Sequence, residues 1–226
     1  MDFFRQTLVI ARKDLRAELR TKEAINASLA FSLVILVLFS FAFDPGEQET
    51  VEMSGGLLWI VFAFAGTLVL NRSFAREVPN DCLDALIAAP ISGAALFLGK
   101  ALANFVLVIS VELVSLPVFG IFYNVHWTTE LPSLLMVLLL GTWALTVIGT
   151  IFSALTVNIK LREVMLPMLT YPILMPALMS AMRLTTLLVT GQPIGDEDMA
   201  WLRMLIGFDV VFTAVSLALV ETVLVG

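Results

Sequence analysis

The sequence predicts an all-α integral membrane protein with six transmembrane helices. Of its 226 residues, 59% are hydrophobic and only 14% are charged, whereas a soluble domain is about half apolar and a quarter charged. The mean hydropathy is +0.97. This composition excludes a soluble enzyme and a disordered chain, and the single Cys82 excludes a disulfide-stabilised secreted scaffold. The net charge of −6 provides no overall basic surface, so no nucleic-acid partner is predicted.

Six apolar stretches are long enough to cross a bilayer, whose core of about 30 Å needs about 20 helical residues. They are Ala24–Phe43, Ser54–Asn71, Phe97–Tyr123, Leu134–Val157, Val164–Val189 and Leu202–Val225. Lipid offers backbone amides no partner, and the stretches lack the alternation of barrel strands, so we expect a helical bundle. No remaining segment could form a separate domain, which predicts a single transmembrane domain over residues 1–226.

The basic residues predict the orientation of this bundle. Eleven of the thirteen Lys and Arg residues precede the first stretch, lie between the second and third stretches, begin the third, or lie between the fourth and fifth. The three connections on the opposite side contain none. By the positive-inside rule, the chain is multi-pass with both termini cytoplasmic. The first stretch is preceded by 23 residues, which favours a retained helix over a cleaved signal peptide.

Residues 1–23 predict an amphipathic helix at the cytoplasmic membrane interface. One face carries apolar side chains at helical spacing: Phe4, Leu8, Ala11, Leu15 and Leu19. Arg5, Arg12 and Arg16 lie on the other face, toward lipid phosphates. Two interpretations stay open at this point: a passive topology anchor, or a helix that moves with the bundle when a cytoplasmic partner pushes on it.

The longest cytoplasmic connection, residues 72–96, predicts a short amphipathic helix. Asn80 can cap it, its apolar side chains are Leu83, Leu86 and Ile87, and Pro90 follows its end. Such a helix has no core of its own, so it should lie on lipid or in a groove of another protein. Three acidic residues that we expect to be exposed, Glu77, Asp81 and Asp84, favour the protein groove, because anionic lipid would repel them.

The chain carries no recognisable nucleotide-binding loop. Gly93, Gly99 and Lys100 only approximate one, because the glycine spacing is one residue too long and Ala101 replaces the magnesium-binding hydroxyl. Lys100 is interpreted as a snorkelling lysine at the entry of a helix. We therefore expect no catalytic residues, and any energy from ATP must come through a partner subunit.

Glu112, Arg183 and Asp209 are the charged residues that fall inside the apolar stretches and away from their ends. Glu112 lies near the bilayer centre, where a carboxylate costs about 3 kcal/mol, so it should face protein or a wet cavity, or be protonated. Arg183 and Asp209 lie in the outer halves of the last two stretches, where they could pair. Both a structural lock between helices and a moving or partner-binding surface remain open.

The fifth stretch contains Pro167, Pro172 and Pro176. Each proline removes a helical hydrogen bond and bends the axis. The pattern predicts either a break near Pro176, with residues 178–189 re-entering from the outer face, or simple kinking.

Several of these segments resemble a known family in order and spacing. They are Phe74-Ala75-Arg76-Glu77, Asp81-Cys82-Leu83-Asp84-Ala85-Leu86, Ala89-Pro90, Phe97-Leu98-Gly99-Lys100-Ala101-Leu102, Val111-Glu112-Leu113-Val114 and Leu116-Pro117. Later segments continue the likeness: Leu166-Pro167, Tyr171-Pro172-Ile173-Leu174, Pro176-Ala177-Leu178, Trp201-Leu202 and Gly207-Phe208-Asp209-Val210. Together they are similar to CcmB, the permease family of the haem-handling ABC transporter in cytochrome c maturation. Ser92-Gly93 departs from the pattern, which puts an ionic partner contact there in doubt.

The resemblance implies an ABC exporter permease that works as a homodimer in the bacterial inner membrane. Its implied partners are the cytoplasmic ATPase subunit CcmA, the membrane proteins CcmC and CcmD, the periplasmic haem chaperone CcmE and the lipid bilayer. The loop helix becomes the coupling helix that docks in the ATPase, through Glu77, Asp81, Leu83, Asp84, Leu86 and Ile87. The permease would export haem or release the haem-loaded chaperone, with haem as substrate and no metal or covalently bound cofactor.

Two other functions stay open on the sequence. One is an ABC permease of the same build that exports a lipid, drug or polysaccharide. The other is a non-transporting membrane scaffold for the chaperone. The only histidine, His126, is interpreted as a surface residue rather than an iron ligand.

Overall fold

A computed structural model describes residues 3–44, 47–78, 86, 90–123, 125, 127–157 and 159–225. This part of the chain forms long helices: α1 (Phe3–Thr21), α2 (Glu23–Ala42), α3 (Gln48–Leu70), α5 (Gly93–Phe122), α6 (Leu131–Thr156), α7 (Arg162–Val189) and α8 (Met199–Val225). Six of them, all except α1, are long and apolar enough to cross a membrane. The prediction of an all-α membrane protein with six spans is therefore confirmed.

Some predicted features lie outside the described residues. They are the predicted cap Asn80 and the loop-helix residues Asp81, Leu83, Asp84 and Ile87, together with Cys82 and His126.

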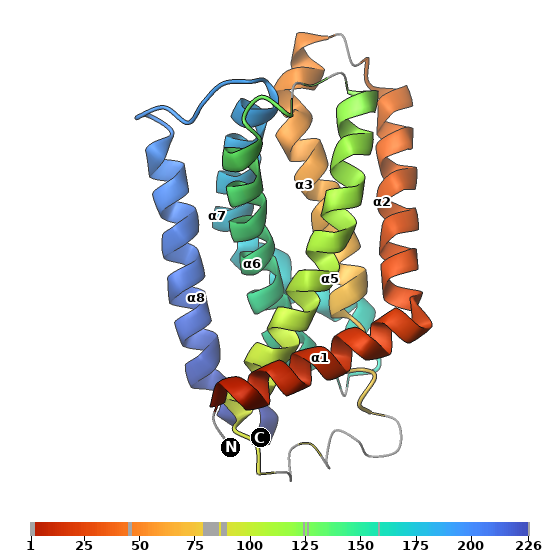
Figure 1. The fold of residues 1–226 in the computed structure, drawn as a ribbon, viewed down its shortest axis with the longest axis vertical. Helices are drawn as coiled ribbons and strands as arrows, with labels where there is room; N and C mark the ends of the chain where they lie inside the picture. The colour runs from red at the N-terminus through yellow and green to blue at the C-terminus, as the bar shows by residue number, and fades with distance from the viewer. Residues whose placement is uncertain are drawn as a thin grey trace.

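The six spans run side by side between the two ends of the molecule, and α1 lies across one end (Figure 1). Both chain termini lie at this same end. Of the spans, α3 and α6 are the most deeply buried, whereas α2 and α8 are peripheral and bury about a quarter of their residues. The bundle thus has an inner pair of helices surrounded by helices that face outward.

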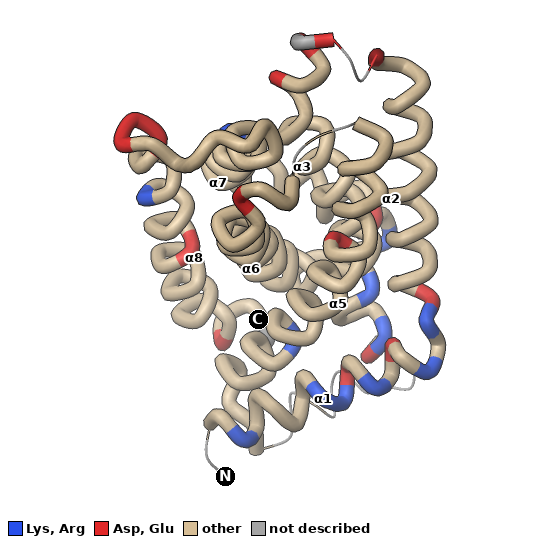
Figure 2. The backbone as a smooth tube through the Cα atoms, turned by 45° about the horizontal axis from the view of Figure 1, so that its top comes forward, with Lys and Arg blue, Asp and Glu red and all other residues tan. Residues whose placement is uncertain are grey.

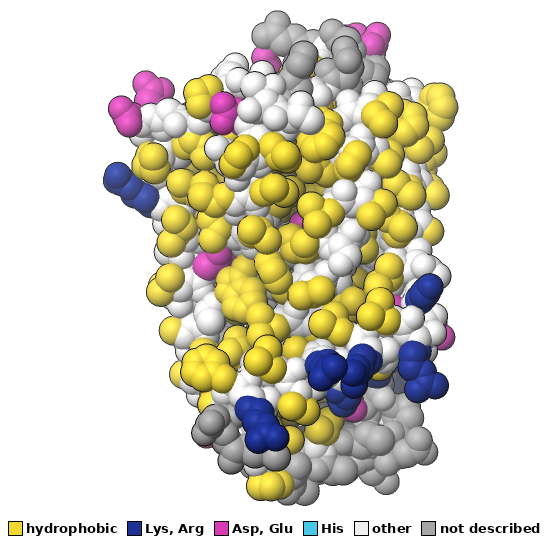
Figure 3. Space-filling model, in the orientation of Figure 1, with side chains coloured by type: hydrophobic (Ala, Val, Ile, Leu, Met, Phe, Trp, Pro, Cys, Tyr) yellow, Lys and Arg dark blue, Asp and Glu magenta, His cyan; other side chains and the backbone are white. Residues whose placement is uncertain are grey.

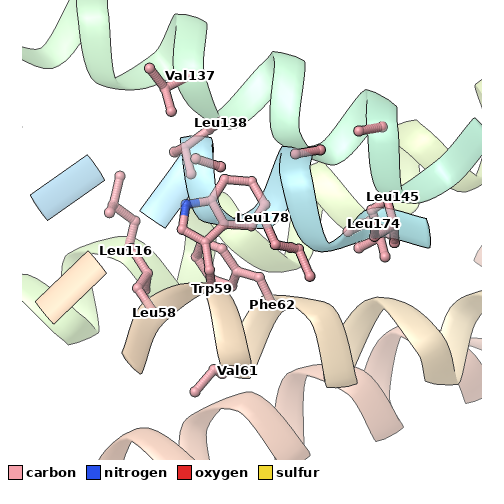
Figure 4. Packing of buried hydrophobic residues seen from close by; sticks show 14 of the residues in the cluster. Leu58, Trp59, Val61, Phe62, Leu116, Val137, Leu138, Leu145, Leu174 and Leu178 are labelled. Carbon is pink, nitrogen blue, oxygen red and sulfur yellow. The ribbon is translucent and has the colours of Figure 1, made fainter. Parts of the chain in front are cut away.

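The core is centred on the indole of Trp59 in α3, which is fully buried. Trp59 and Phe62 meet leucines of α6 and α7 such as Leu138 and Leu178 (Figure 4). The indole Nε1 donates a hydrogen bond to Thr185 Oγ1 at 2.9 Å, which satisfies the one polar group of a buried tryptophan. The core therefore contains a defined contact between α3 and α7.

Charged residues gather at the two ends of the bundle (Figure 2). The basic end carries α1, residues 71–78 and residues 159–162, and the acidic end carries residues 43, 44 and 47, residues 127–130 and residues 190–198. Between them lies an apolar belt, with the basic side chains of α1 at its lower edge (Figure 3). Phe41 and Ile121 are 85% and 79% exposed on the outside of the spans, as expected where lipid is the solvent.

Helix α7 continues without interruption from Arg162 to Val189 and contains Pro167, Pro172 and Pro176 in its interior. The predicted break near Pro176, with a re-entrant segment after it, is therefore wrong. The reason is that helices of a bundle tolerate proline where neighbouring helices and side-chain hydroxyls compensate the freed backbone groups.

The contact between α3 and α7 depends on a glycine. A Cβ atom added at Gly55 would lie 2.3 Å from the Met182 carbonyl oxygen and 2.5 Å from Thr186 Oγ1. The Gly55 amide also donates to that hydroxyl at 3.1 Å. Small residues allow this close backbone approach between membrane helices.

We expect Gly55→Ala to separate α3 from α7 and to lower stability by about 1–3 kcal/mol, the usual cost of overpacking. Thermal unfolding of the purified protein measures this change. Gly56→Ala is the matched control, because an added Cβ there meets nothing within 4 Å. Equal unfolding temperatures for the two variants would show that the close approach at Gly55 is unimportant.

Candidate functional site

The side chain of Lys100, in the first turns of α5, is fully buried at the basic end. Its Nζ donates to Asp14 Oδ2 of α1 at 3.0 Å, to the Ser73 carbonyl at 2.9 Å and to Glu77 Oε1 at 3.1 Å. It also lies 4.9 Å from the centre of the Phe74 ring. A buried ammonium is tolerated only when it is paired in this way. The interpretation of Lys100 as a snorkelling lysine is therefore wrong.

Neighbouring polar residues extend these contacts into a larger group, which we call the Lys100 cluster. Its members are Lys13, Asp14 and Glu18 of α1, Ser73, Arg76 and Glu77 of the segment 71–78, and Lys100 and Asn104 of α5. All of them except Lys100 line a cavity of about 260 Å³. The cluster joins the helix across the end of the bundle, the beginning of the long loop and the third span.

Glu18 connects the cluster to α2. One carboxylate oxygen pairs with Arg76, and the other accepts hydrogen bonds from the amides of Ala24 at 2.7 Å and Ile25 at 3.0 Å. These are first-turn amides of α2, where a negative charge is stabilised by the helix dipole. Since Glu18 is fully buried, it fixes the corner between α1 and α2.

Helix α1 reaches α5 at Gly99, where an added Cβ would lie 2.8 Å from the Thr7 carbonyl and from Ile10 Cβ. Thr7, Ile10, Ala11 and Glu18 are buried on this side of α1. Ala11 therefore faces protein, which corrects its predicted place on the membrane face. The helix has a third, protein-binding face that the prediction of two faces omitted.

The other two faces of α1 agree with an interfacial position. Phe4, Leu8 and Leu19 are 74%, 64% and 60% exposed, and Arg12 and Arg16 are exposed on the adjoining side.

Glu77 points into the protein, with only 12% of its side chain exposed. Its carboxylate accepts hydrogen bonds from Lys13 and Lys100, so the expectation that it is an exposed charge is wrong. Burial alone would raise the pKa of Glu77, but attraction to Lys100 and the bond from Lys13 outweigh burial and hold the pKa below its ordinary value. Leu86, the one loop-helix residue described, is helical and half-buried.

A line of side-chain hydroxyls on α6 leads from the cluster into the membrane. Asn104 Nδ2 donates to Ser73 Oγ and to Thr150 Oγ1, both at 2.9 Å. Further along α6, Thr142 Oγ1 donates to Glu112 Oε2 at 2.6 Å. Glu112 is 1% exposed and so faces protein rather than lipid. Its other oxygen has no hydrogen-bond partner among the described residues.

Arg183 and Asp209 do not pair, which corrects the sequence expectation. Arg183 Nε lies 3.5 Å from Asp198 Oδ1, and its side chain is 56% exposed. Asp209 is 7% exposed on the buried side of α8, and neither carboxylate oxygen has a partner among the described residues. The two side chains point in different directions, since one faces outward and the other faces the bundle.

The sequence of the N-terminal helix itself contains one indication of this site. Asp14 and Glu18 are four residues apart and therefore share one face of an otherwise basic helix. Two carboxylates on one face require cations opposite them, and the long loop and the third span supply Arg76 and Lys100. These ion pairs hold α1 to the beginning of the long loop and to α5.

Within the described ranges, no group of three or more His, Cys, Asp and Glu residues could hold a metal ion.

We expect Glu77→Gln to lower the unfolding temperature at neutral pH, because it removes the charge that Lys100 and Lys13 attract. The folded pKa of Glu77 is depressed, so its stabilisation is present above the unfolded value of about 4.3 and is lost as pH falls through the folded value. The difference from wild type should therefore shrink in acid. Thermal unfolding between pH 3 and 8 measures it, and Glu197→Gln at the acidic end is the control. A difference that stays constant down to pH 3 would refute the charge interaction.

Comparison with known proteins places the chain in a family. Residues 5–224 match the family described as CcmB protein. The chain is 34% identical over 166 residues to heme exporter protein B of Rhodobacter capsulatus, which covers 74% of this chain and 76% of that protein. The corresponding protein of Paracoccus denitrificans is 31% identical over the same length and shares. That of Pseudomonas aeruginosa is 27% identical over 212 residues, or 94% of each chain. With six spans and a match over nearly its whole length, the chain belongs to the CcmB family.

Proposed function

We propose that this protein is the transmembrane permease subunit of an ABC complex in bacterial cytochrome c maturation. Its role is to couple ATP hydrolysis by a partner ATPase to haem export or to release of the haem-loaded periplasmic chaperone. The CcmB family match and the relatives named heme exporter protein B support the haem assignment. The observation that carries the coupling role is the buried Lys100, which holds α1 and the beginning of the long loop on α5.

The orientation follows from the distribution of charge. The basic end, with both termini, faces the cytoplasm, since the basic residues lie on this side. The acidic end then faces the periplasm, where the chaperone CcmE operates, and the protein resides in the bacterial inner membrane with CcmC and CcmD as neighbours. Haem is a substrate of this complex, and ATP acts only through the partner subunit.

The coupling step begins in the loop of residues 72–96. The apolar side chains Leu83, Leu86 and Ile87, with Asp81 and Asp84, dock in the ATPase subunit CcmA, and two copies of the permease are moved together. Glu77 acts from inside as a positioning residue. Because Lys100 binds both Glu77 and Asp14, displacement of the loop pulls on α1 and α5 at once, which changes the bundle between two arrangements.

We expect Lys100→Met to uncouple the complex, because it removes the buried cation that Asp14 and Glu77 share and leaves them only the half-exposed Lys13. Breaking such a buried group costs about 3–5 kcal/mol, so cytochrome c formation should fall at least tenfold while the protein remains in the membrane and the ATPase remains bound. Lys160→Met, an exposed lysine at the same end, is the control.

If Lys100→Met is not inserted, the double variant Lys100→Met/Asp14→Asn restores a neutral cluster and can be measured instead. Full cytochrome c formation by either inserted variant would refute the coupling role of the cluster.

We further expect the double variant Leu83→Asp/Leu86→Asp to detach the ATPase, since it places charges in an apolar docking contact. Co-purification of the ATPase with the membrane-inserted variant measures this. Leu83→Ile/Leu86→Ile keeps the contact apolar and should retain the ATPase. Undiminished co-purification with the double Asp variant would contradict the assignment of this loop.

A further inference from the structure

A cleft of about 620 Å³ opens between α2, α3 and α7 at the basic end, next to the Lys100 cluster. Its volume lies in the range of about 300–1,000 Å³ that is typical of ligand sites. The described residues that line it change in character with depth. Charged side chains of Arg72, Arg76 and Arg162 lie at the end of the bundle, and the rings of Phe31 and Phe64 lie toward the membrane interior.

The distance between these two zones matches a lipid at the membrane boundary. Arg72 follows Phe64 by eight residues in α3 and the turn after it, which corresponds to about 12 Å along a helix. Phe31 of α2 lies 6.4 Å from Phe64 of α3 between ring centres, and both rings line the cleft. Behind the lining, Phe64 lies 5.4 Å from the ring centre of Tyr171 in α7. Phe64 is 48% exposed. An occupant therefore needs a polar head and an apolar body that continues into the bilayer.

The ion pairs in the cleft identify the charge of this head. Arg72 is paired with Glu23, and Arg76 is paired with the buried Glu18. Among the described residues, the charged lining groups left without an ion pair are one cation and one anion, Arg162 and Glu163, at the beginning of α7. A guanidinium binds phosphate well, and a carboxylate accepts hydrogen bonds from an ammonium group.

We propose that this cleft binds a phospholipid with a zwitterionic headgroup that carries a primary ammonium, such as phosphatidylethanolamine. Arg162 holds the phosphate, Glu163 accepts hydrogen bonds from the ammonium group, and an acyl chain lies along Phe31 and Phe64. A purely anionic headgroup would leave Glu163 opposed to a like charge. A haem would find none of its common axial ligands, since the described lining residues include no His, Met or Cys. The lipid so bound separates α2 from α7 beside the Lys100 cluster.

The test uses the full-length protein, purified, stripped of lipid and titrated with single phospholipids, with bound lipid counted by native mass spectrometry. Wild type should bind phosphatidylethanolamine more tightly than phosphatidylcholine or phosphatidylglycerol. Arg162→Gln should weaken all three about tenfold, the effect of losing one charge-assisted hydrogen bond. Glu163→Gln should reduce the affinity for phosphatidylethanolamine to that for phosphatidylcholine, whose quaternary ammonium donates no hydrogen bond.

Two controls keep the result interpretable. Arg203→Gln changes an exposed arginine at the other end of the bundle and should bind lipid like wild type. If Arg162→Gln fails to fold, Arg162→Lys keeps the charge without the planar fork and should weaken binding in the same direction. Equal binding by the Arg162 and Arg203 variants, tighter binding of phosphatidylglycerol than phosphatidylethanolamine, or displacement of the lipid by haem with the same dependence on Arg162 would each overturn the proposal.

Discussion

The architecture of the basic end depends on the burial of one ammonium group. Lys100 has no exposed surface, so its charge must be neutralised by protein, and the carboxylates that do so come from two other segments of the chain. This requirement places α1 across the bundle and fixes the first residues of the long loop on α5. The Gly99 contact allows the approach, but without the charges a mostly polar face of α1 would have little reason to leave water.

Polarity inside the bundle is arranged differently from polarity at its end. Most of the buried hydroxyls of α6 need no opposite charge, because they donate to a nearby carbonyl oxygen, as Thr146 does to the Thr142 carbonyl and Ser153 to the Leu70 carbonyl. They allow α6 to pack closely against α5 and to accept the amide of Asn104. The inner helices are thus held by packing and neutral hydrogen bonds, whereas the outer connection to α1 is held by ions.

The six spans could be predicted from the sequence because a bilayer requires helices of a minimum length and an apolar composition, and both can be counted in the sequence. The amphipathic N-terminal helix could also be predicted, but its third face could not, because Thr7 packs against α5 at Gly99 and Glu18 binds Arg76 and the first amides of α2. The predictions of an exposed Glu77 and a snorkelling Lys100 were wrong for the same reason. The residues that surround these two side chains come from segments that are distant in the sequence. The predicted pairing of Arg183 with Asp209 was wrong because the rotation of each helix about its axis decides which residues its side chains contact. The spacing of residues within one helix does not reveal the rotation of the neighbouring helix.

The three prolines of α7 have a consequence beyond its continuity. Each lacks an amide proton, so at three levels the helix contains a carbonyl that no backbone donor holds. Bending at those levels breaks no additional backbone bond, which makes α7 more compliant along its axis than α6, whose described interior has none of these gaps. Helix α7 can therefore bend more easily than α6 while the two helices stay packed against each other.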